Sequence, residues 1–172
     1  MAQQIDVTNK SSARYALNAG NTVLSGGFYA ARLTKDLREK RGLVYTVGSG
    51  LDLDTHRGRF QVYYGCDPGK VAEAHDLIVR DLKAMQNTPV TAEELHRAKG
   101  MLLRQIPLSE SSFGDIAGLM LQLSMEGKPL NAMTVAAEHY VKLTPKDVQA
   151  AFRKYLRPDA FVTAVKGPAP KG

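Results

Sequence analysis

Apolar residues recur along most of this chain at helical spacing. A stripe at steps of three and four predicts a helix from Val71 to Met85. The capping box Thr91–Glu94 begins a second predicted helix, whose stripe continues to Ile106. Ser109 is the expected N-cap of a third helix, which Gly127 would end. The middle of the chain is therefore predicted to be mostly helical.

The third predicted helix has an apolar face, and two further helices follow it. We expect that face to be buried, and it consists of Ile116, Leu119, Met120 and Leu123. A shorter helix is predicted from Ala132 to Tyr140. The last begins with an N-cap hydroxyl, a proline and an acid in the first turn, and its buried face comprises Val148, Phe152 and Tyr155.

Two segments alternate in polarity as strands do. Leu43, Tyr45 and Val47 are expected to share one face of the first strand. In the second strand the shared face consists of Phe60, Val62, Tyr64 and Cys66. The polar segment 52–58 between them is typical of a hairpin loop, so the pair should be antiparallel. Cys66 should pack as a small hydrophobic residue.

The two ends of the chain add further strand signals. Ile5 and Val7 alternate with polar residues, and residues 160–165 are predicted to form a closing strand. Earlier, from about Ser12 to Lys40, the pattern is helical with a break at residues 25–27, and Phe28 opens the second piece. Few strands and many amphipathic helices, not regularly alternating, indicate an α+β fold in which helices cover one face of an antiparallel sheet.

Composition argues against several classes of protein. The chain has 172 residues, 44% hydrophobic content and one cysteine, which fits one soluble domain without a disulfide framework. Its net charge of +6 is scattered, without the basic pattern of a nucleic-acid-binding domain. No stretch approaches the ~18 apolar residues of a membrane span. The first four residues do not resemble a signal peptide, and the compartment stays open.

A search for catalytic motifs finds no metal or nucleophile site. The four histidines include no pair at metal-binding spacing. The closest approach to the inverted zinc motif H-x-x-E-H ends in Glu138-His139, but Val135 stands in place of the first ligand. Ser111-Ser112 and Cys66 lack the surroundings of a catalytic nucleophile. We therefore predict that this chain holds no metal.

The segment 21–49 carries the most specific pattern. Gly26 and Gly27 permit a close turn between helices. Arg38 is predicted at a helix end and Tyr45 on the strand that follows, with Gly42 in the turn between them. A purely structural interpretation is available, in which Arg38 satisfies the helix dipole and Tyr45 is a half-buried strand residue.

This segment resembles the C-terminal half-domain of the insulinase (pitrilysin-like) zinc metallopeptidases. The pattern runs N-x-V-L-x-G-G-F-x-x-x-R-L and then L-R-E-K-x-G-L-x-Y-x-V-x-S, and a looser similarity extends to Gly167. Ser25 departs from the family, which usually has glycine there. The resemblance implies one half-domain over residues 1–167, cut from a longer protein and truncated at its first strand, with 168–172 as a tail or linker.

The resemblance also implies a function and partners. In this family one half holds zinc through H-x-x-E-H, and the opposite half supplies a tyrosine that stabilises the oxyanion and an arginine that binds the substrate backbone. These match Tyr45 and Arg38, and Gly26 and Gly27 are further candidates for substrate contact. The expected partners are a zinc-binding half, in cis or on another subunit, a peptide substrate, and a second copy at an exposed sheet edge.

Two other functions remain as alternatives. The family includes subunits that scaffold assemblies and have lost catalysis, so this chain could be a non-catalytic partner. A basic nucleic-acid-binding domain is the weaker alternative, because the chain shows no recognition-helix pattern and no basic strand studded with aromatic residues.

Overall fold

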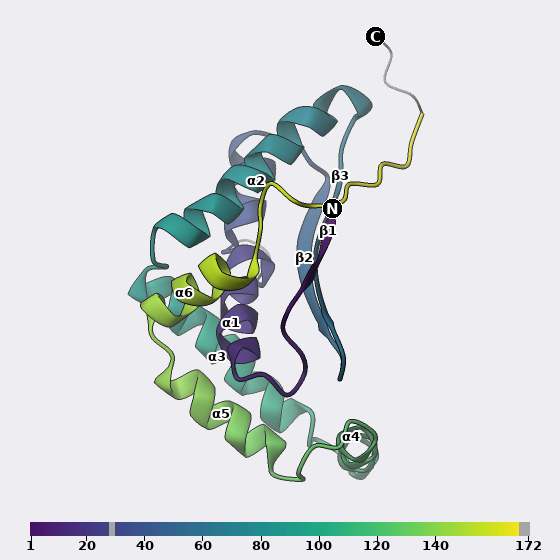
Figure 1. Ribbon diagram of the computed structural model, residues 1–172, viewed down its shortest axis with the longest axis vertical. Helices are drawn as coiled ribbons and strands as arrows, with labels where there is room; N and C mark the ends of the chain where they lie inside the picture. The colour runs from purple at the N-terminus through teal and green to yellow at the C-terminus, as the bar shows by residue number, and fades with distance from the viewer. Residues whose placement is uncertain (28–29, 169–172) are drawn as a thin grey trace.

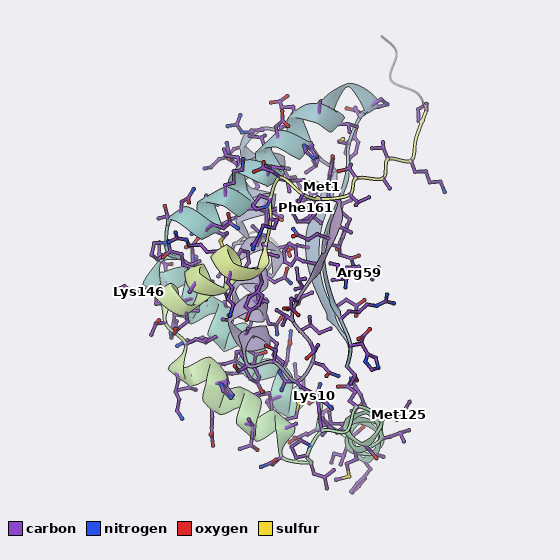
Figure 2. All side chains as sticks on the ribbon, viewed as in Figure 1. Met1, Lys10, Arg59, Met125, Lys146 and Phe161 are labelled. Carbon is purple, nitrogen blue, oxygen red and sulfur yellow. The ribbon has the colours of Figure 1, made fainter. Side chains whose placement is uncertain are left out.

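The chain folds into two layers, a small sheet and a set of helices on one of its faces (Figure 1). This is a computed structural model, and it describes residues 1–27 and 30–168. In Figure 2 Arg59 extends from the sheet on the side away from the helices. The predicted α+β architecture is confirmed. Phe28 and residues 169–172 of the predicted tail lie outside the described residues.

Three antiparallel strands form the sheet in the order β1-β3-β2. They are β1 (Ala2–Ile5), β2 (Thr46–Leu53) and β3 (Gly58–Gly65). The hairpin predicted between β2 and β3 is confirmed, with Leu53 opposite Gly58. Its turn is held by Asp54 Oδ1, which accepts hydrogen bonds from the backbone N–H groups of His56 and Arg57 at 2.6 and 2.8 Å.

The helices follow the predicted order. They are α1 (Ala13–Ser25), α2 (Val71–Asn87), α3 (Ala92–Leu108), α4 (Phe113–Met125), α5 (Ala132–Lys142) and α6 (Pro145–Tyr155). The capping boxes that begin α3 and α6 form as predicted, at Thr91 and Thr144. Both stripes expected in α2 and α3 are buried over most of their length.

The core lies between β3 and the helices. Phe60 of β3 and Phe152 of α6 are fully buried and meet edge to face, with ring centroids 6.2 Å apart. Helix α1 runs through this layer. Gly20 lets it approach α6 closely, because a Cβ atom at that position would lie 2.2 Å from Cε2 of Phe152. Cys66 is half-buried just beyond β3 and packs against the core.

The closing strand predicted at 160–165 is wrong. Only Val162 bridges to β1, exchanging backbone hydrogen bonds with Ala2 at 2.8 and 2.9 Å. This contact is at the first residue of β1, on the side of β1 that faces away from β3. The residues on either side of Val162 form no bridge to a strand within the described chain.

The start and the burial of α4 also differ from prediction. Ser112, not Ser109, is the N-cap, and its hydroxyl accepts from the backbone N–H of Asp115 at 3.1 Å. Ser109 instead closes α3, because its N–H donates to carbonyls of that helix. Within α4 only Leu123 is buried. The helix lies at one end of the molecule (Figure 1), and of the predicted face Ile116 and Leu119 are only half-buried while Met120 is exposed.

Candidate functional site

The two halves of the 21–49 segment are joined by side-chain hydrogen bonds. Ser49 of β2 donates from its hydroxyl to Asn21 Oδ1 of α1 at 2.6 Å. Ser25 donates to the backbone oxygen of Ser49 at 3.2 Å. Ser25, where the resembling family usually has glycine, therefore serves here to connect the end of α1 to the sheet.

Arg32 is used as a structural cation. Its Nε and Nη2 atoms each lie 2.7 Å from a carboxylate oxygen of Glu94, in a two-point fork. Glu94 also completes the capping box of α3 by accepting from the backbone N–H of Thr91. The guanidinium and this cap lower the pKa of Glu94 to about 2. The segment after α1 is thus tied to the start of α3.

Gly26 and Gly27 lie at the end of α1, against its last turn and against α3. The N–H of Gly26 donates to the carbonyl of Thr22 at 2.8 Å. Gly27 has φ of 71°, and a Cβ atom there would lie 3.0 Å from Sδ of Met101. No contact described for this part of the chain joins the two glycines to Tyr45 or Arg38. Their predicted role in substrate contact stays a prediction.

Arg38 lies on a short π-helical turn, Thr34–Lys40. The turn is anchored on one side by Leu37, which is fully buried, and on the other by Asp36, which pairs with Arg80 of α2. Arg38 itself is exposed. Its carbonyl accepts from the N–H of Gly42 at 3.1 Å, and Gly42 has φ of 59°. The predicted glycine turn between a helix end and the following strand is confirmed.

Tyr45 immediately precedes β2 and is 69% exposed. The prediction that it shares a strand face with Leu43 and Val47 is wrong, because β2 begins only at Thr46. Leu43 and its neighbour Val44 are both buried, so burial does not alternate before that point. The backbone of Tyr45 is nevertheless held by the sheet, since its N–H donates to the carbonyl of Gly65 at 2.8 Å.

Sequence reasoning missed the two residues that contact the Tyr45 side chain and its loop. The Tyr45 hydroxyl donates to Asp67 Oδ1 at 2.6 Å, and Lys70 Nζ lies 3.2 Å from Asp67 Oδ2. Lys70 also donates to the carbonyl of Gly42 at 3.4 Å. The hydrogen bond and the charge of Asp67 raise the pKa of Tyr45. Asp67-Pro68 begins a 3₁₀ turn after β3. The sequence of these two residues can indicate a turn, but it does not indicate the contact between Asp67 and Tyr45.

The residues present do not fit a zinc site. Among residues 1–27 and 30–168, no cluster of three histidine, cysteine or acidic side chains could hold a metal ion. His139 is used otherwise, since its ring stacks on Tyr15 with centroids 4.2 Å apart. Nor does any helix in the described parts of the chain have the length and apolar character to cross a membrane.

The described residues thus form an antiparallel sheet covered by helices on one face, with Tyr45 tethered beside the edge strand β2. The family model of the peptidase M16 inactive domain matches residues 1–102. Because this match covers more than half of the sequence, the chain belongs to the M16 peptidase family, in its inactive domain. The family expected from the 21–49 segment is confirmed.

Individual relatives support this assignment. An uncharacterised zinc protease of Streptomyces coelicolor is 31% identical over 147 residues, which are 83% of this chain and 31% of that protein. Another, from Mycobacterium leprae, is 38% identical over 89 residues, or 52% of this chain and 20% of that protein. The chain therefore spans less than a third of these curated relatives. Zinc belongs to the family, as the names of these proteins indicate.

Solved structures share the fold. The peptidase M16 inactive domain from Pseudomonas fluorescens has a TM-score of 0.80 and 28% identity, over 92% of this chain and 37% of that one. A protease from Helicobacter pylori has a TM-score of 0.81 over 91% of this chain and 38% of that one, and at 22% identity it shows the fold alone.

Proposed function

We propose that this chain is the substrate-contacting half of a zinc-dependent peptidase that cleaves peptide bonds in extended peptides. In this proposal Tyr45 stabilises the oxyanion and Arg38 binds the substrate backbone. The observation that carries it is the exposure of two polar side chains of the 21–49 segment. Asn21, Ser49 and Arg32 are half-buried, whereas the side chains of Arg38 and Tyr45 are exposed at the surface.

The chemistry of the two side chains suits these roles. A phenol hydroxyl can donate a hydrogen bond to the oxygen that gains negative charge when a peptide carbonyl is attacked. Tyr45 is tied to Gly65 through its backbone, so its ring projects from a fixed point of the sheet. A guanidinium presents several N–H donors in a rigid fork, which suits the carbonyl oxygens of an extended peptide.

The test of the tyrosine role is Tyr45→Phe in the complete zinc peptidase that contains this chain. We expect kcat to fall by about 10²–10³ with KM little changed, since the lost hydrogen bond forms only in the transition state. Tyr63→Phe is the matched control, because Tyr63 is 58% exposed on neighbouring β3. A loss confined to KM, or an equal loss in both variants, would remove Tyr45 from this role.

The test of the arginine role compares Arg38→Lys with Lys40→Gln in the same enzyme. Lysine keeps the charge but loses the fork, so Arg38→Lys should raise KM for long peptides more than for short ones. Lys40 is exposed on the same turn, and its variant should leave KM unchanged if overall charge is unimportant. Equal effects of the two variants would indicate simple attraction by charge instead.

The proposed partner is a zinc-binding half, in cis or on another subunit. The described residues offer no ligand set, so the purified chain alone should cleave no peptide and retain no stoichiometric zinc. Tight one-to-one zinc with peptidase activity would contradict the proposal. If Tyr45→Phe leaves the complete protein unchanged and no zinc-binding half exists, the non-catalytic scaffold function replaces this one.

A second copy of the chain is a further proposed partner, at the sheet edge beside β3. A groove of about 220 Å³ lies between the end of β3 and residues 163–166. Val62 of β3 forms backbone hydrogen bonds with Met1. Alternate residues of an antiparallel strand direct their backbone groups to the same side, so those of Tyr64 also point away from β2, toward this groove. Such an edge favours pairing with another strand. Sedimentation over a range of concentrations would show a dimer, and a monomer throughout would leave the zinc-binding half as the partner.

A further inference from the structure

Asp67 connects the exposed hydroxyl of Tyr45 to the start of α2. One carboxylate oxygen accepts from that hydroxyl at 2.6 Å, and the other lies 3.2 Å from Lys70 Nζ. Lys70 in turn donates to the carbonyl of Gly42, in the turn that separates Arg38 from Tyr45. The ion pair Asp67–Lys70 therefore binds both ends of the segment 42–45, Asp67 at Tyr45 and Lys70 at Gly42.

This contact occupies the group on which the proposed function depends. A phenol hydroxyl can donate only one hydrogen bond, and in this structure the Tyr45 hydroxyl donates it to Asp67. Stabilising an oxyanion requires the same proton. The carboxylate also places a negative charge beside the hydroxyl, and this charge opposes the approach of a second anion. Asp67 and the oxyanion therefore compete for one donor.

We propose that Asp67 is a positioning residue that holds the Tyr45 hydroxyl in a resting orientation, from which the reacting substrate withdraws it. The inference rests on the proposed function of Tyr45 and adds a residue to it. Lys70 has two effects in this arrangement. It fixes the carboxylate against the Gly42 turn, and it partly neutralises the charge that an incoming oxyanion meets.

The electrostatics of the cluster agree with this arrangement. The hydrogen bond to Asp67 raises the pKa of Tyr45, and Lys70 opposes that effect. Its contacts with Tyr45 and Lys70 lower the pKa of Asp67, so the carboxylate stays ionised at neutral pH and accepts a hydrogen bond from the phenol hydroxyl. Cys66 is the third titratable group that acts on the hydroxyl, and its influence is smaller than that of Asp67.

The contact can be tested on this chain without any partner. Tyrosine labelled with ¹³C at Cζ reports the titration of each phenol by NMR, and Tyr45→Phe assigns the signal. In Asp67→Asn the pKa of Tyr45 should fall toward the ordinary value of about 10, since the ionised acceptor is gone. Asp76→Asn is the matched control, because Asp76 is an exposed acid on α2. An unchanged Tyr45 titration in Asp67→Asn would overturn the proposal.

The role in catalysis is tested in the complete enzyme. An asparagine keeps the shape of Asp67 but accepts a hydrogen bond more weakly, so Asp67→Asn should raise kcat about two- to fivefold. In the Tyr45→Phe background the same substitution should change nothing, because it acts through the hydroxyl. A lower or unchanged kcat in the single variant overturns the resting role, and so does an effect that persists without the hydroxyl.

The two experiments separate the failure of this inference from the failure of the proposed function. If Tyr45→Phe itself leaves kcat unchanged, Tyr45 is not an oxyanion donor, and the resting role of Asp67 is excluded together with the proposed function. The NMR titration then still measures the contact between Asp67 and Tyr45. If Tyr45→Phe lowers kcat but Asp67→Asn shifts neither the titration nor kcat, the proposed function stands and Asp67 is excluded.

Discussion

Helices α1 and α4 have the same length of 13 residues and are both rich in apolar side chains, yet their environments are opposite. Helix α1 buries seven residues and lies between the sheet and the other helices. Helix α4 buries Leu123 alone and leaves Phe113 and Met125 exposed by 93% and 80%. An apolar face is buried only where the fold supplies a surface opposite it.

The difference shows which parts of the chain maintain the fold and which are available for contact. Around α1, substitutions that shorten a side chain should lower the free energy of unfolding, because cavities or unpaired groups would remain. On α4, similar substitutions should change the free energy of unfolding of the isolated chain only slightly. Pairs of matched substitutions can test this contrast, since the two regions contain the same residue types.

The largest expected effect is that of Phe152→Ala. The ring is fully buried between Phe60 of β3 and Gly20 of α1, so its loss should lower the free energy of unfolding by about 3–5 kcal/mol. Phe113→Ala on α4 should change it by less than about 0.5 kcal/mol. Urea denaturation of both variants measures the difference. Comparable losses would mean that α4 is buried in solution.

Glu94→Gln should have the next largest effect. It weakens both the fork to Arg32 and the α3 cap, and should cost about 1.5–3 kcal/mol near neutral pH. Because folding lowers the pKa of Glu94 from 4.5 to about 2, its contribution is complete above about pH 4.5 and is lost as pH falls through about 2. Unfolding measured across this range should depend less on pH in the variant.

The control for Glu94 lies on α4. The Asp115 carboxylate accepts hydrogen bonds from the hydroxyls of Ser111 and Ser112 at the start of that helix, but it has no ion pair within the described residues. Asp115→Asn should therefore have a markedly smaller effect than Glu94→Gln at every pH. If the two effects were equal, the cap alone would account for Glu94 and the fork to Arg32 would contribute nothing.

The smallest effects, of opposite sign, are expected for two glycines. Gly20→Ala should destabilise by about 1–3 kcal/mol, because its Cβ atom would meet the buried ring of Phe152. Gly118→Ala on α4 should stabilise by about 0.5–1 kcal/mol, since no atom lies within 4 Å and alanine favours the helix. Thermal unfolding of both distinguishes them, and stabilisation by both would contradict the close packing of α1 on α6.

The sequence predicted those parts of the fold that local chemistry controls. The caps at Thr91 and Thr144 each join residues three apart, so their side chains meet wherever the helix starts. The hairpin between β2 and β3 follows from alternation and a short polar turn. The ungapped 21–49 segment was specific enough to indicate the family, which the match to the family model then established.

Much of the candidate site depends on contacts that no local pattern contains. Tyr45 and Asp67 are 22 residues apart, and Arg32 and Glu94 are 62 apart. Whether residues 160–165 form a strand depends on the backbone that lies beside them, and whether α4 is buried depends on the surface that lies opposite it. The sequence by itself determined most of the helices, the hairpin and the family. Only the tertiary structure decided which side chains meet, because burial and pairing depend on surfaces brought together from distant parts of the chain.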